Sequence, residues 1–354
     1  MGSYRSRESY FSKDPEKRAR QLANLKNGYK KSLAVRALKS PIDDPFYPTD
    51  IVSYLERHYF IPETKKAVVL EDWQKERILK PLFSVDPKTG LRRYSLALIG
   101  LPKKNSKSTL AAMVANYFLF QDEDFGEIIL TANSREQSSW IISDKLKKSL
   151  LMNKEQSRWV KIENDVIENK KTGTVARVIA PNYKTSSGLN PSLTIFDELW
   201  SYLDTDSGGS RKFYDELTTV PTRKQPLTLI TTYAGYDEDS LLYEIYKRGL
   251  EGKDKKMFFF WTHDNLASWI TRGYLNTQRK RLRHNTYLRL HENRWTSSEA
   301  AFIEMEQWDA CVDTTHRPLL PNKRVMLFVG VDIGISHDTS AVVAVYKENN
   351  RLFL

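Results

Sequence analysis

Two segments about ninety residues apart carry the side chains whose types and spacing could do chemistry. The first, KKNSKST, runs from Lys103 to Thr109, and the second is the acidic pair Asp197 and Glu198 in PSLTIFDELW. Lysine, hydroxyl and carboxylate groups are the ones that hold the phosphates and the Mg²⁺ of a bound nucleotide. Together the two segments predict the two halves of a nucleotide-phosphate site.

The first segment lies between a strand pattern and a helix pattern. Tyr94 to Ile99 is a β-rich apolar run, and Ser108 to Phe120 carries apolar residues at helical spacing. In such a loop, backbone N–H groups surround a phosphate, a lysine adds charge at the β and γ oxygens, and the next hydroxyl ligates Mg²⁺. Lys107 and Ser108 suit these last two roles. The common GxxxxGK[ST] pattern is not matched, since Ser106 replaces its second glycine, and lysine-rich turns without nucleotide also occur.

The second segment could supply the metal chemistry. Leu193 to Phe196 has the pattern of a short buried strand, and Asp197 at its end could hold Mg²⁺ through water. Glu198 could polarise the attacking water. An isolated acidic pair is more often a solvated turn after a core strand. In combination with Lys107 and Ser108, the hydrolytic interpretation is favoured.

Two further pairs of residues, one before the first segment and one after the second, could take part in the same site. Trp73 and Gln74 precede the loop, where an indole could stack on adenine and an amide could both donate to it and accept from it. Thr231 and Thr232 end the apolar run PLTLITT, and their hydroxyls could sense the γ-phosphate. The alternatives are that Trp73 anchors a core and that the threonines are ordinary strand-end residues.

The ordered set of segments resembles the large terminase subunit of tailed bacteriophages, the DNA-packaging motor, in its HK97-like branch. KKNSKST is similar to that branch's RKNGKS loop, SSGLNPSLTIFDEL to its Walker B region, and TTYAGYD to its coupling motif, over about residues 66 to 340. Lys103 replaces the family's arginine, and Ser106 replaces a glycine, so a residue with a Cβ must adopt the backbone conformation of the turn. The resemblance implies that one run of residues binds ATP: Lys103, Lys104, Asn105, Ser106, Lys107, Ser108 and Thr109.

The resemblance also implies an activity and partners. These are ATP hydrolysis with Mg²⁺, coupled to translocation of double-stranded DNA into a procapsid by a ring of about five subunits. The ring would dock on a portal protein and work with a small terminase subunit, in the host cytoplasm and away from membranes. A ring motor of this type needs a basic residue from a neighbouring subunit to stabilise charge on the γ-phosphate. The candidates for this trans-acting finger are Lys184, Arg177, Arg211 and Arg223.

A second pattern lies at the C-terminal end, where RVMLFVGVDIGISHDTSAVVAVYKENNRLFL predicts two strands joined by a polar turn. The resemblance implies the start of an RNase H-like nuclease, with Asp332 as its first metal-binding aspartate. Such nucleases need several carboxylates from different strands, and the chain ends at Leu354, so we expect no metal-dependent cleavage by this polypeptide. The alternatives are the phosphate-binding hairpin of actin-like ATPases and sugar kinases, or an aspartate, such as Asp338, that caps a hairpin.

Composition and charge agree with a nucleic-acid-handling protein. The 354 residues are 40% apolar, enough for a sizeable core, and the single cysteine excludes an internal disulfide framework. The net charge is +11, and residues 1–40, with eleven Lys/Arg and three acids, carry +8 of it. This arm could form a helix that binds phosphates or a partner, or one with a solvated basic face. The sequence contains no apolar stretch of transmembrane length.

The strand and helix patterns predict an α/β fold with a mostly parallel sheet between flanking helices, and the resemblance specifies a P-loop NTPase of the ASCE type. We expect a hairpin that turns at Lys171 to Gly173, and a last core strand at Phe258 to His263. Four regions are predicted: a basic helical region at 1–65, the ATPase domain at 66–263, a helical linker at 264–322 and the start of the nuclease fold at 323–354.

Two other functions share some of these features. A superfamily 2 helicase-like DNA-dependent ATPase has a glutamine motif and adjacent acids, but it needs a second RecA-like domain, for which the chain after His263 is too short. A non-enzymatic portal or capsid adaptor would explain the basic arm and not the loop. DNA-stimulated ATPase activity and strand unwinding separate these functions.

Overall fold

The computed structural model describes residues 14, 17, 43–131, 138–163, 166–180, 188–202, 209–296, 305–313, 315, 325–333, 340–348 and 350–353. The N-terminal arm apart from residues 14 and 17, Lys184 and Asp338 lie outside the described residues. The chain divides into two compact units, Met1–Ala300 and Ala301–Leu354. This boundary falls inside the predicted linker, residues 264–322.

The first unit alternates strands and helices along the chain, as its sequence predicts. In chain order its elements are α2 (Ile51–His58), β1 (Phe60–Ile61), β2 (Lys66–Ala67), α3 (Asp72–Gln74), η3 (Lys75–Leu79), α4 (Lys80–Leu82), β3 (Leu96–Gly100), α5 (Lys107–Gln121), β4 (Glu127–Thr131), α6 (Ser138–Met152), α7 (Lys154–Ser157), β5 (Val160–Glu163), β6 (Val166–Asn169), β7 (Val175–Ile179), β8 (Leu193–Asp197), η4 (Leu199–Ser201), α9 (Gly209–Thr218), β9 (Leu227–Thr232), α10 (Leu241–Glu251), β10 (Met257–Trp261), α11 (Arg272–Arg281) and α12 (His284–Glu292).

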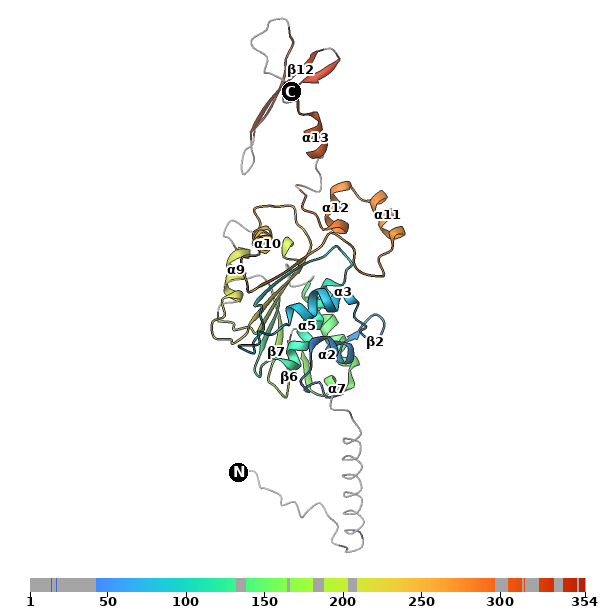
Figure 1. Ribbon diagram of the computed structural model, residues 1–354, viewed down its shortest axis with the longest axis vertical. Helices are drawn as coiled ribbons and strands as arrows, with labels where there is room; N and C mark the ends of the chain where they lie inside the picture. The colour runs from blue at the N-terminus through green and yellow to red at the C-terminus, as the bar shows by residue number, and fades with distance from the viewer. Residues whose placement is uncertain are drawn as a thin grey trace. The chain divides into compact units, whose positions relative to one another are not determined.

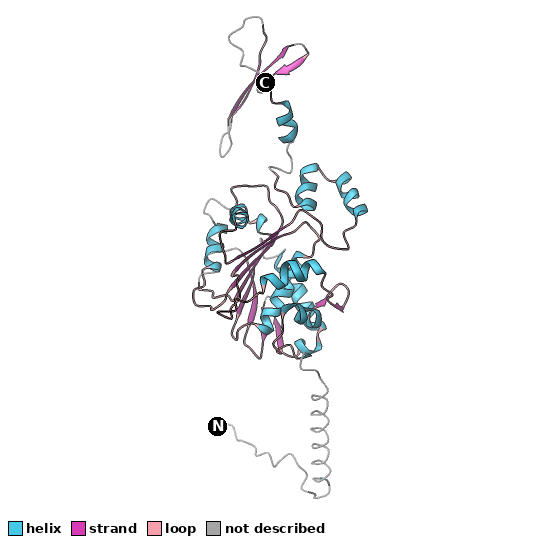
Figure 2. Ribbon diagram, in the orientation of Figure 1, coloured by secondary structure: helices cyan, strands magenta, loops and turns pink. Residues whose placement is uncertain are grey.

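An eight-stranded sheet forms the centre of this unit, in the order β10-β3-β9-β8-β4-β7-β6-β5. The six strands from β10 to β7 are parallel, and β6 and β5 are added antiparallel at one edge. Figure 2 shows the strands as one layer with helices on both sides. The predicted α/β fold with a mostly parallel sheet is therefore confirmed.

The sheet is central because its strands are apolar on both faces. Every residue of β8 and β9 is buried, as expected for parallel strands covered on both sides. Helix α5 is buried around most of its circumference and packs with α2 and α6 on one face, while α9 and α10 cover the other (Figure 1). Among the described helices, none is long and apolar enough to cross a membrane.

The antiparallel edge is larger than the sequence analysis predicted. The expected hairpin exists, since β6 pairs with β7 and the chain turns through Gly173 at φ +69°. The preceding segment, however, forms a further strand, β5, which pairs with β6. The sequence did not predict this additional strand, because VKIE is short and polar, and β6 supplies the hydrogen bonds that complete it.

The carboxyl ends of four parallel strands meet at one edge of the sheet. Gly100 lies opposite both Thr232 and Trp261, and Asp197 lies opposite Thr231. The chain approaches closely here, because a Cβ atom on Gly100 would lie 2.0 Å from Cε3 of Trp261. This edge is where parallel α/β sheets bind ligands.

The second unit contains α13 (Met305–Cys311) and the antiparallel strands β11 (Phe328–Asp332), β12 (Ala341–Glu348) and β13 (Arg351–Phe353). The two strands predicted from the sequence are β11 and β12, with Asp332 opposite Ala341. Asp332 is exposed at the end of β11. Within the part of the chain that the structure describes, no cluster of three or more His, Cys, Asp or Glu side chains could hold a metal ion.

Candidate functional site

The loop between β3 and α5 is held in a conformation that favours glycine at two positions. Lys104 has φ +71°, and Ser106, which precedes the first residue of α5, has φ +56° and ψ +25°. The start of the loop is bonded to β9, where the Leu101 N–H donates to the Thr232 carbonyl at 3.0 Å. The loop therefore leads directly into the N-terminus of a helix, whose free N–H groups favour an anion.

Two side chains at the start of α5 reach the acidic pair after β8. Lys107 is 5% exposed, and its Nζ donates to the carbonyls of Leu101 and Pro102 at 3.0 and 3.3 Å and lies 3.8 Å from Oε1 of Glu198. The Ser108 hydroxyl donates to Oδ2 of Asp197 at 2.9 Å. The two segments singled out in the sequence thus form one site.

Asp197 is fixed from both sides. Its Oδ1 accepts a hydrogen bond of 2.8 Å from the Thr231 hydroxyl, while its Oδ2 accepts from Ser108. Burial raises the pKa of Asp197, and these two hydrogen bonds and the charge of Lys107 oppose that shift. A hydroxyl next to a carboxylate is a hard oxygen donor set of the kind that binds Mg²⁺, so Ser108 and Asp197 fit this metal.

Glu198 has the less common backbone conformation of the pair, with φ +53° and ψ +48°. Its Oε2 accepts a hydrogen bond of 2.9 Å from Nε1 of Trp200, and its side chain keeps 29% of its surface exposed. Burial raises the pKa of Glu198, and the charge of Lys107 opposes this. Left-handed non-glycine residues concentrate at functional sites, where the surrounding contacts hold them in place.

Lys107 is a buried cation between these acids. Burial lowers the pKa of its ammonium group, and the charges of Glu198 and Asp197 oppose the shift. Its Nζ also lies 4.8 Å from the centroid of the Tyr233 ring. A buried lysine held by two backbone carbonyls, the carboxylate of Glu198 and a ring is well positioned to neutralise a negatively charged ligand.

The segment that contains Trp73 and Gln74 contacts the same loop. Gln74 is buried, and its Nε2 donates to Oγ of Ser106 at 3.0 Å while its Oε1 accepts from the Glu71 N–H at 2.9 Å. Trp73 packs partly against the core, and its Nε1 donates to Glu71. Gln74 and the phosphate loop are therefore neighbours, and in this structure the amide of Gln74 is bonded within the protein.

The remaining loop residues divide into exposed and buried ones. The side chains of Lys103 and Lys104 are exposed, and Thr109 is half-buried. Asn105 is fully buried; its Nδ2 donates to Pro102 O and Asn265 Oδ1, and its Oδ1 accepts from the N–H groups of Leu266 and Ala267. The side chain of Asn105 thus ties the loop to the segment that follows β10.

The backbone of Ser106 provides a test of the loop geometry. A left-handed residue with a Cβ costs roughly 1–2 kcal/mol, so S106G should remove this cost while losing the hydrogen bond from Gln74. S106A loses the same hydrogen bond and keeps the strain. We expect S106A to be less stable than S106G by about 1 kcal/mol in urea unfolding. Equal stabilities would show that the position is not left-handed in solution.

The two predicted coupling threonines differ in their contacts. Both are buried at the end of β9. Thr231 contacts Asp197, as described above, whereas the Thr232 hydroxyl donates to the carbonyl of Tyr233 at 3.1 Å. Only Thr231 is bonded to a member of the acidic pair through its side chain.

The arginines proposed as trans-acting fingers lie apart from this site within the chain. Arg177 on β7 pairs with Glu127 at 3.1 Å, and Arg211 on α9 pairs with Glu244. Arg223 donates to the carbonyl of Asn190 and to Glu123 at the opposite edge of the sheet, where the strands begin. A residue that acts on a neighbouring subunit need not lie near its own loop.

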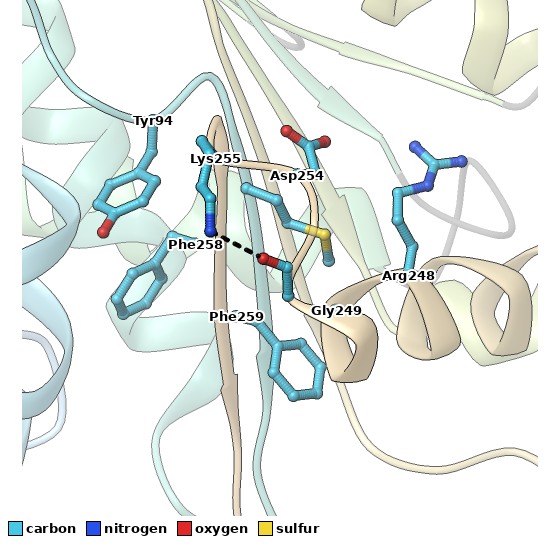
Figure 3. Close-up of a pocket in the computed structure, with 9 residues that line it drawn as sticks. Tyr94, Arg248, Gly249, Asp254, Lys255, Phe258 and Phe259 are labelled. Atoms are coloured by element: carbon cyan, nitrogen blue, oxygen red, sulfur yellow. Dashed lines mark hydrogen bonds between the residues drawn. The ribbon is translucent and has the colours of Figure 1, made fainter.

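A cavity of about 390 Å³ also lies at that opposite edge, around the start of β10 and the end of α10. Figure 3 shows Tyr94 and Phe258 next to Lys255, whose Nζ donates to the Gly252 carbonyl at 3.4 Å, and Phe259 next to the helix that carries Gly249. Among the described residues that line it, there is neither an acidic pair nor a helix N-terminus. The loop edge therefore remains the candidate site.

The structure adds three residues that sequence reasoning missed. Trp200 bonds Glu198, Tyr233 lies beside Lys107, and Arg289 on α12 has its guanidinium carbon over the rings of both. Trp200 stands two residues after Glu198, and Tyr233 directly follows Thr232. This closeness in sequence is the signal that could have identified them. Arg289 carries no local signal.

The comparison with protein families decides the membership of this chain. The model described as "Terminase large subunit, ATPase domain" matches residues 72–251, which include the loop, the acidic pair and the threonines. The chain belongs to this family. The predicted resemblance to a large terminase subunit is therefore confirmed.

A solved large terminase structure shares the fold of this chain. The large terminase of bacteriophage HK97 superposes with a TM-score of 0.60 at 18% identity, covering 86% of this chain and 66% of that one. The chain thus spans slightly less than two thirds of that terminase. The large terminase of a thermophilic bacteriophage gives 0.48 at 12% identity, covering 78% and 66%, and the ATPase domain of the Thermus phage P74-26 large terminase gives 0.45 at 12%, covering 62% and 98%. Among curated proteins, none matches the chain.

Proposed function

We propose that this terminase chain hydrolyses ATP at the loop edge of its sheet and uses the energy to move double-stranded DNA into a procapsid. One observation supports this above all: Asp197 joins the loop helix to β9 through Ser108 and Thr231, with Glu198 beside Lys107. These are the groups that phosphoryl transfer needs at one place. Membership of a terminase ATPase family agrees with it.

In the proposed mechanism each residue has one task. The N–H groups of the loop and of the first turn of α5, apart from that of Lys103, surround the phosphates, and Lys107 neutralises charge as the γ-phosphate leaves. Ser108 and Asp197 would hold Mg²⁺, which when bound supplies positive charge at the β and γ oxygens. Glu198 orients the attacking water and accepts its proton. Trp73 and Gln74 face the base, with the amide of Gln74 released from Ser106.

Thr231 and Thr232 complete the proposal by reporting phosphate loss. When the γ-phosphate leaves, the charge near Asp197 changes, and the hydrogen bond that Thr231 donates to Asp197 transmits this change to β9. Thr232 lies next along this strand, and its carbonyl is bonded to the loop at Leu101. Strand β9, which lies between β3 and β8 in the sheet, is thus the proposed coupling element.

The proposed assembly is a ring of about five subunits in the host cytoplasm, on a portal protein and with a small terminase subunit. The trans-acting finger would come from Lys184, Arg177, Arg211 or Arg223 of a neighbour. Substituting each with alanine and mixing the product with an excess of wild-type chain would identify it. Only a residue that acts in trans impairs hydrolysis at its neighbour's intact site.

The deciding experiment measures phosphate release with and without double-stranded DNA, together with DNA protected from nuclease inside portal-bearing procapsids. The proposal expects hydrolysis that DNA stimulates, and protected DNA that requires ATP. Strand unwinding without protection would instead indicate the helicase-like ATPase. Absence of hydrolysis in the presence of DNA and portal would indicate an adaptor.

A further inference from the structure

The end of α12 is bound to the phosphate loop. The Lys103 N–H donates to the carbonyl of Leu290 at 2.6 Å, and Nδ2 of Asn265 donates to the carbonyl of His291 at 2.7 Å. The last carbonyls of a helix have no partners within it, so here the loop region supplies them. A helix from the segment assigned to the linker therefore contacts the loop through its backbone.

Directly before Leu290 in the same helix, Arg289 is enclosed by aromatic rings. It is 3% exposed, and its guanidinium carbon lies 4.0 Å from the centroid of Tyr236, 4.6 Å from Trp200 and 5.1 Å from Tyr233. Burial lowers the pKa of Arg289, while Tyr233 and Glu198 favour its charged form. An arginine retains its charge even so, and attraction to ring faces is strongest in desolvated sites such as this one.

Two of these rings lead to the proposed reaction centre. The Trp200 ring, 5.3 Å from Tyr233, carries the N–H that donates to Glu198 at 2.9 Å. The Tyr233 ring lies 4.8 Å from Nζ of Lys107. A displacement of either ring would therefore move a contact of Glu198 or of Lys107.

We infer that Arg289 is a positioning residue of the ATP site, which holds Trp200 and Tyr233, and through them Glu198 and Lys107, while α12 is bound to the loop. This inference rests on the proposed function. It makes hydrolysis conditional on α12, because removal of the helix would take the guanidinium from between the rings. Hydrolysis would therefore be regulated by any binding partner, or any mechanical force, that moves α11 and α12 relative to the sheet.

The alternative is that Arg289 only fills the core. A cation is a poor choice for that purpose, since burying a charge is costly and an apolar side chain of similar volume packs as well. If Arg289 only filled space in the core, its substitution would affect the stability of the fold alone. A positioning residue would affect turnover more than nucleotide binding, because the rings contact the groups that act in the transition state.

The test uses three variants of the full chain. R289M keeps volume and removes charge, R289K keeps charge and removes the planar group, and W200F keeps a ring and removes the N–H to Glu198. We expect R289M and W200F to lower kcat by about 10- to 100-fold, with the dissociation constant for ATP changed less than about threefold. R289K should recover part of the loss, since a lysine can still attract the rings.

R279A is the matched control. Arg279 on α11 also lies over a ring, 5.2 Å from the centroid of Tyr287, and is exposed. R279A removes a guanidinium group from the same pair of helices, α11 and α12. This substitution should leave kcat within about twofold of the wild-type value. Melting temperatures of all variants separate unfolding from loss of turnover.

A double variant and a spectroscopic measurement make the test decisive. If Arg289 acts through Trp200, the kcat of R289M/W200F should resemble that of the slower single variant instead of falling by the product of the two effects. The indole N–H resonance of Trp200, assigned by its loss in W200F, should shift in R289M and stay in place in R279A. An unmoved resonance or fully multiplicative effects would overturn the inference. The Trp200 resonance can be measured without ATP hydrolysis. If the wild-type chain hydrolysed no ATP, that result would therefore contradict the proposed function and not this inference.

Discussion

Replacing Glu198 with Gln should abolish steady-state ATP hydrolysis while ATP still binds. The amide has nearly the same size, and its oxygen can still accept the hydrogen bond from Trp200, so the left-handed backbone at φ +53° keeps its support. The amide cannot accept a proton from water. Loss of a general base costs about 10²- to 10⁴-fold, so phosphate release should fall by at least that range.

The measurement compares phosphate release in the presence of DNA with binding of a fluorescent ATP analogue. E198Q should bind the analogue within a few-fold of the wild type, because Glu198 is assigned to water and not to phosphate. D197N is the contrasting variant: it alters the carboxylate that Ser108 and Thr231 contact, and binding that depends on Mg²⁺ should weaken. Hydrolysis that survives in E198Q would show that another group is the base.

The parallel sheet could be predicted because its strands are apolar on both faces and end in recognisable residues. Strand β8 extends one residue beyond the predicted run, to Asp197, because the backbone of Asp197 pairs with Thr231 of β9. The strand expected from Tyr94 begins two residues later, at Leu96. The reason is local: Tyr94 packs edge-on against Phe258, and the chain joins the sheet through the Ser95 N–H to Lys256.

Residues of the candidate site could be predicted where they stand in or beside a sequence motif. They could not be predicted where they are far from any such motif in the sequence. Lys107, Ser108 and Asp197 follow from residue type and position after a strand. Arg289 lies 91 residues after Glu198 in the sequence, and its neighbours are set by how α12 packs on the loop. No local pattern encodes that contact, because it depends on backbone carbonyls, which every residue has.

The strain at Glu198 was also beyond prediction. The sequence shows an acidic pair, but it does not show that the second acid has φ +53° while the first lies in a regular strand. The conformation turns the two carboxylates toward different partners: Asp197 toward Ser108 and Thr231, and Glu198 toward Trp200 and Lys107. Two adjacent acids therefore have different partners because the backbone changes direction between them.

Replacing Lys107 with Ala should weaken nucleotide binding itself. The side chain is buried, its Nζ donates to the Leu101 and Pro102 carbonyls, and it is 3.8 Å from Glu198. A hydrogen bond to a charged group contributes about 1.5–3 kcal/mol, which corresponds to a loss of ATP affinity of about 10- to 150-fold. Turnover should fall further, since the charge that develops on the γ-phosphate loses its closest cation.

The change also leaves Asp197 and Glu198 without their buried counter-charge, so K107A should lower the melting temperature as well as the affinity. K107M restores most of the volume and separates packing from charge, because its affinity should remain as low as that of K107A. K145A removes a lysine that pairs with Glu63 on a different part of the surface and should bind ATP like the wild type. Affinity for ATP is measured by calorimetry below each variant's melting temperature. Wild-type affinity in K107A would remove this loop from the nucleotide site, whatever the pattern of its sequence.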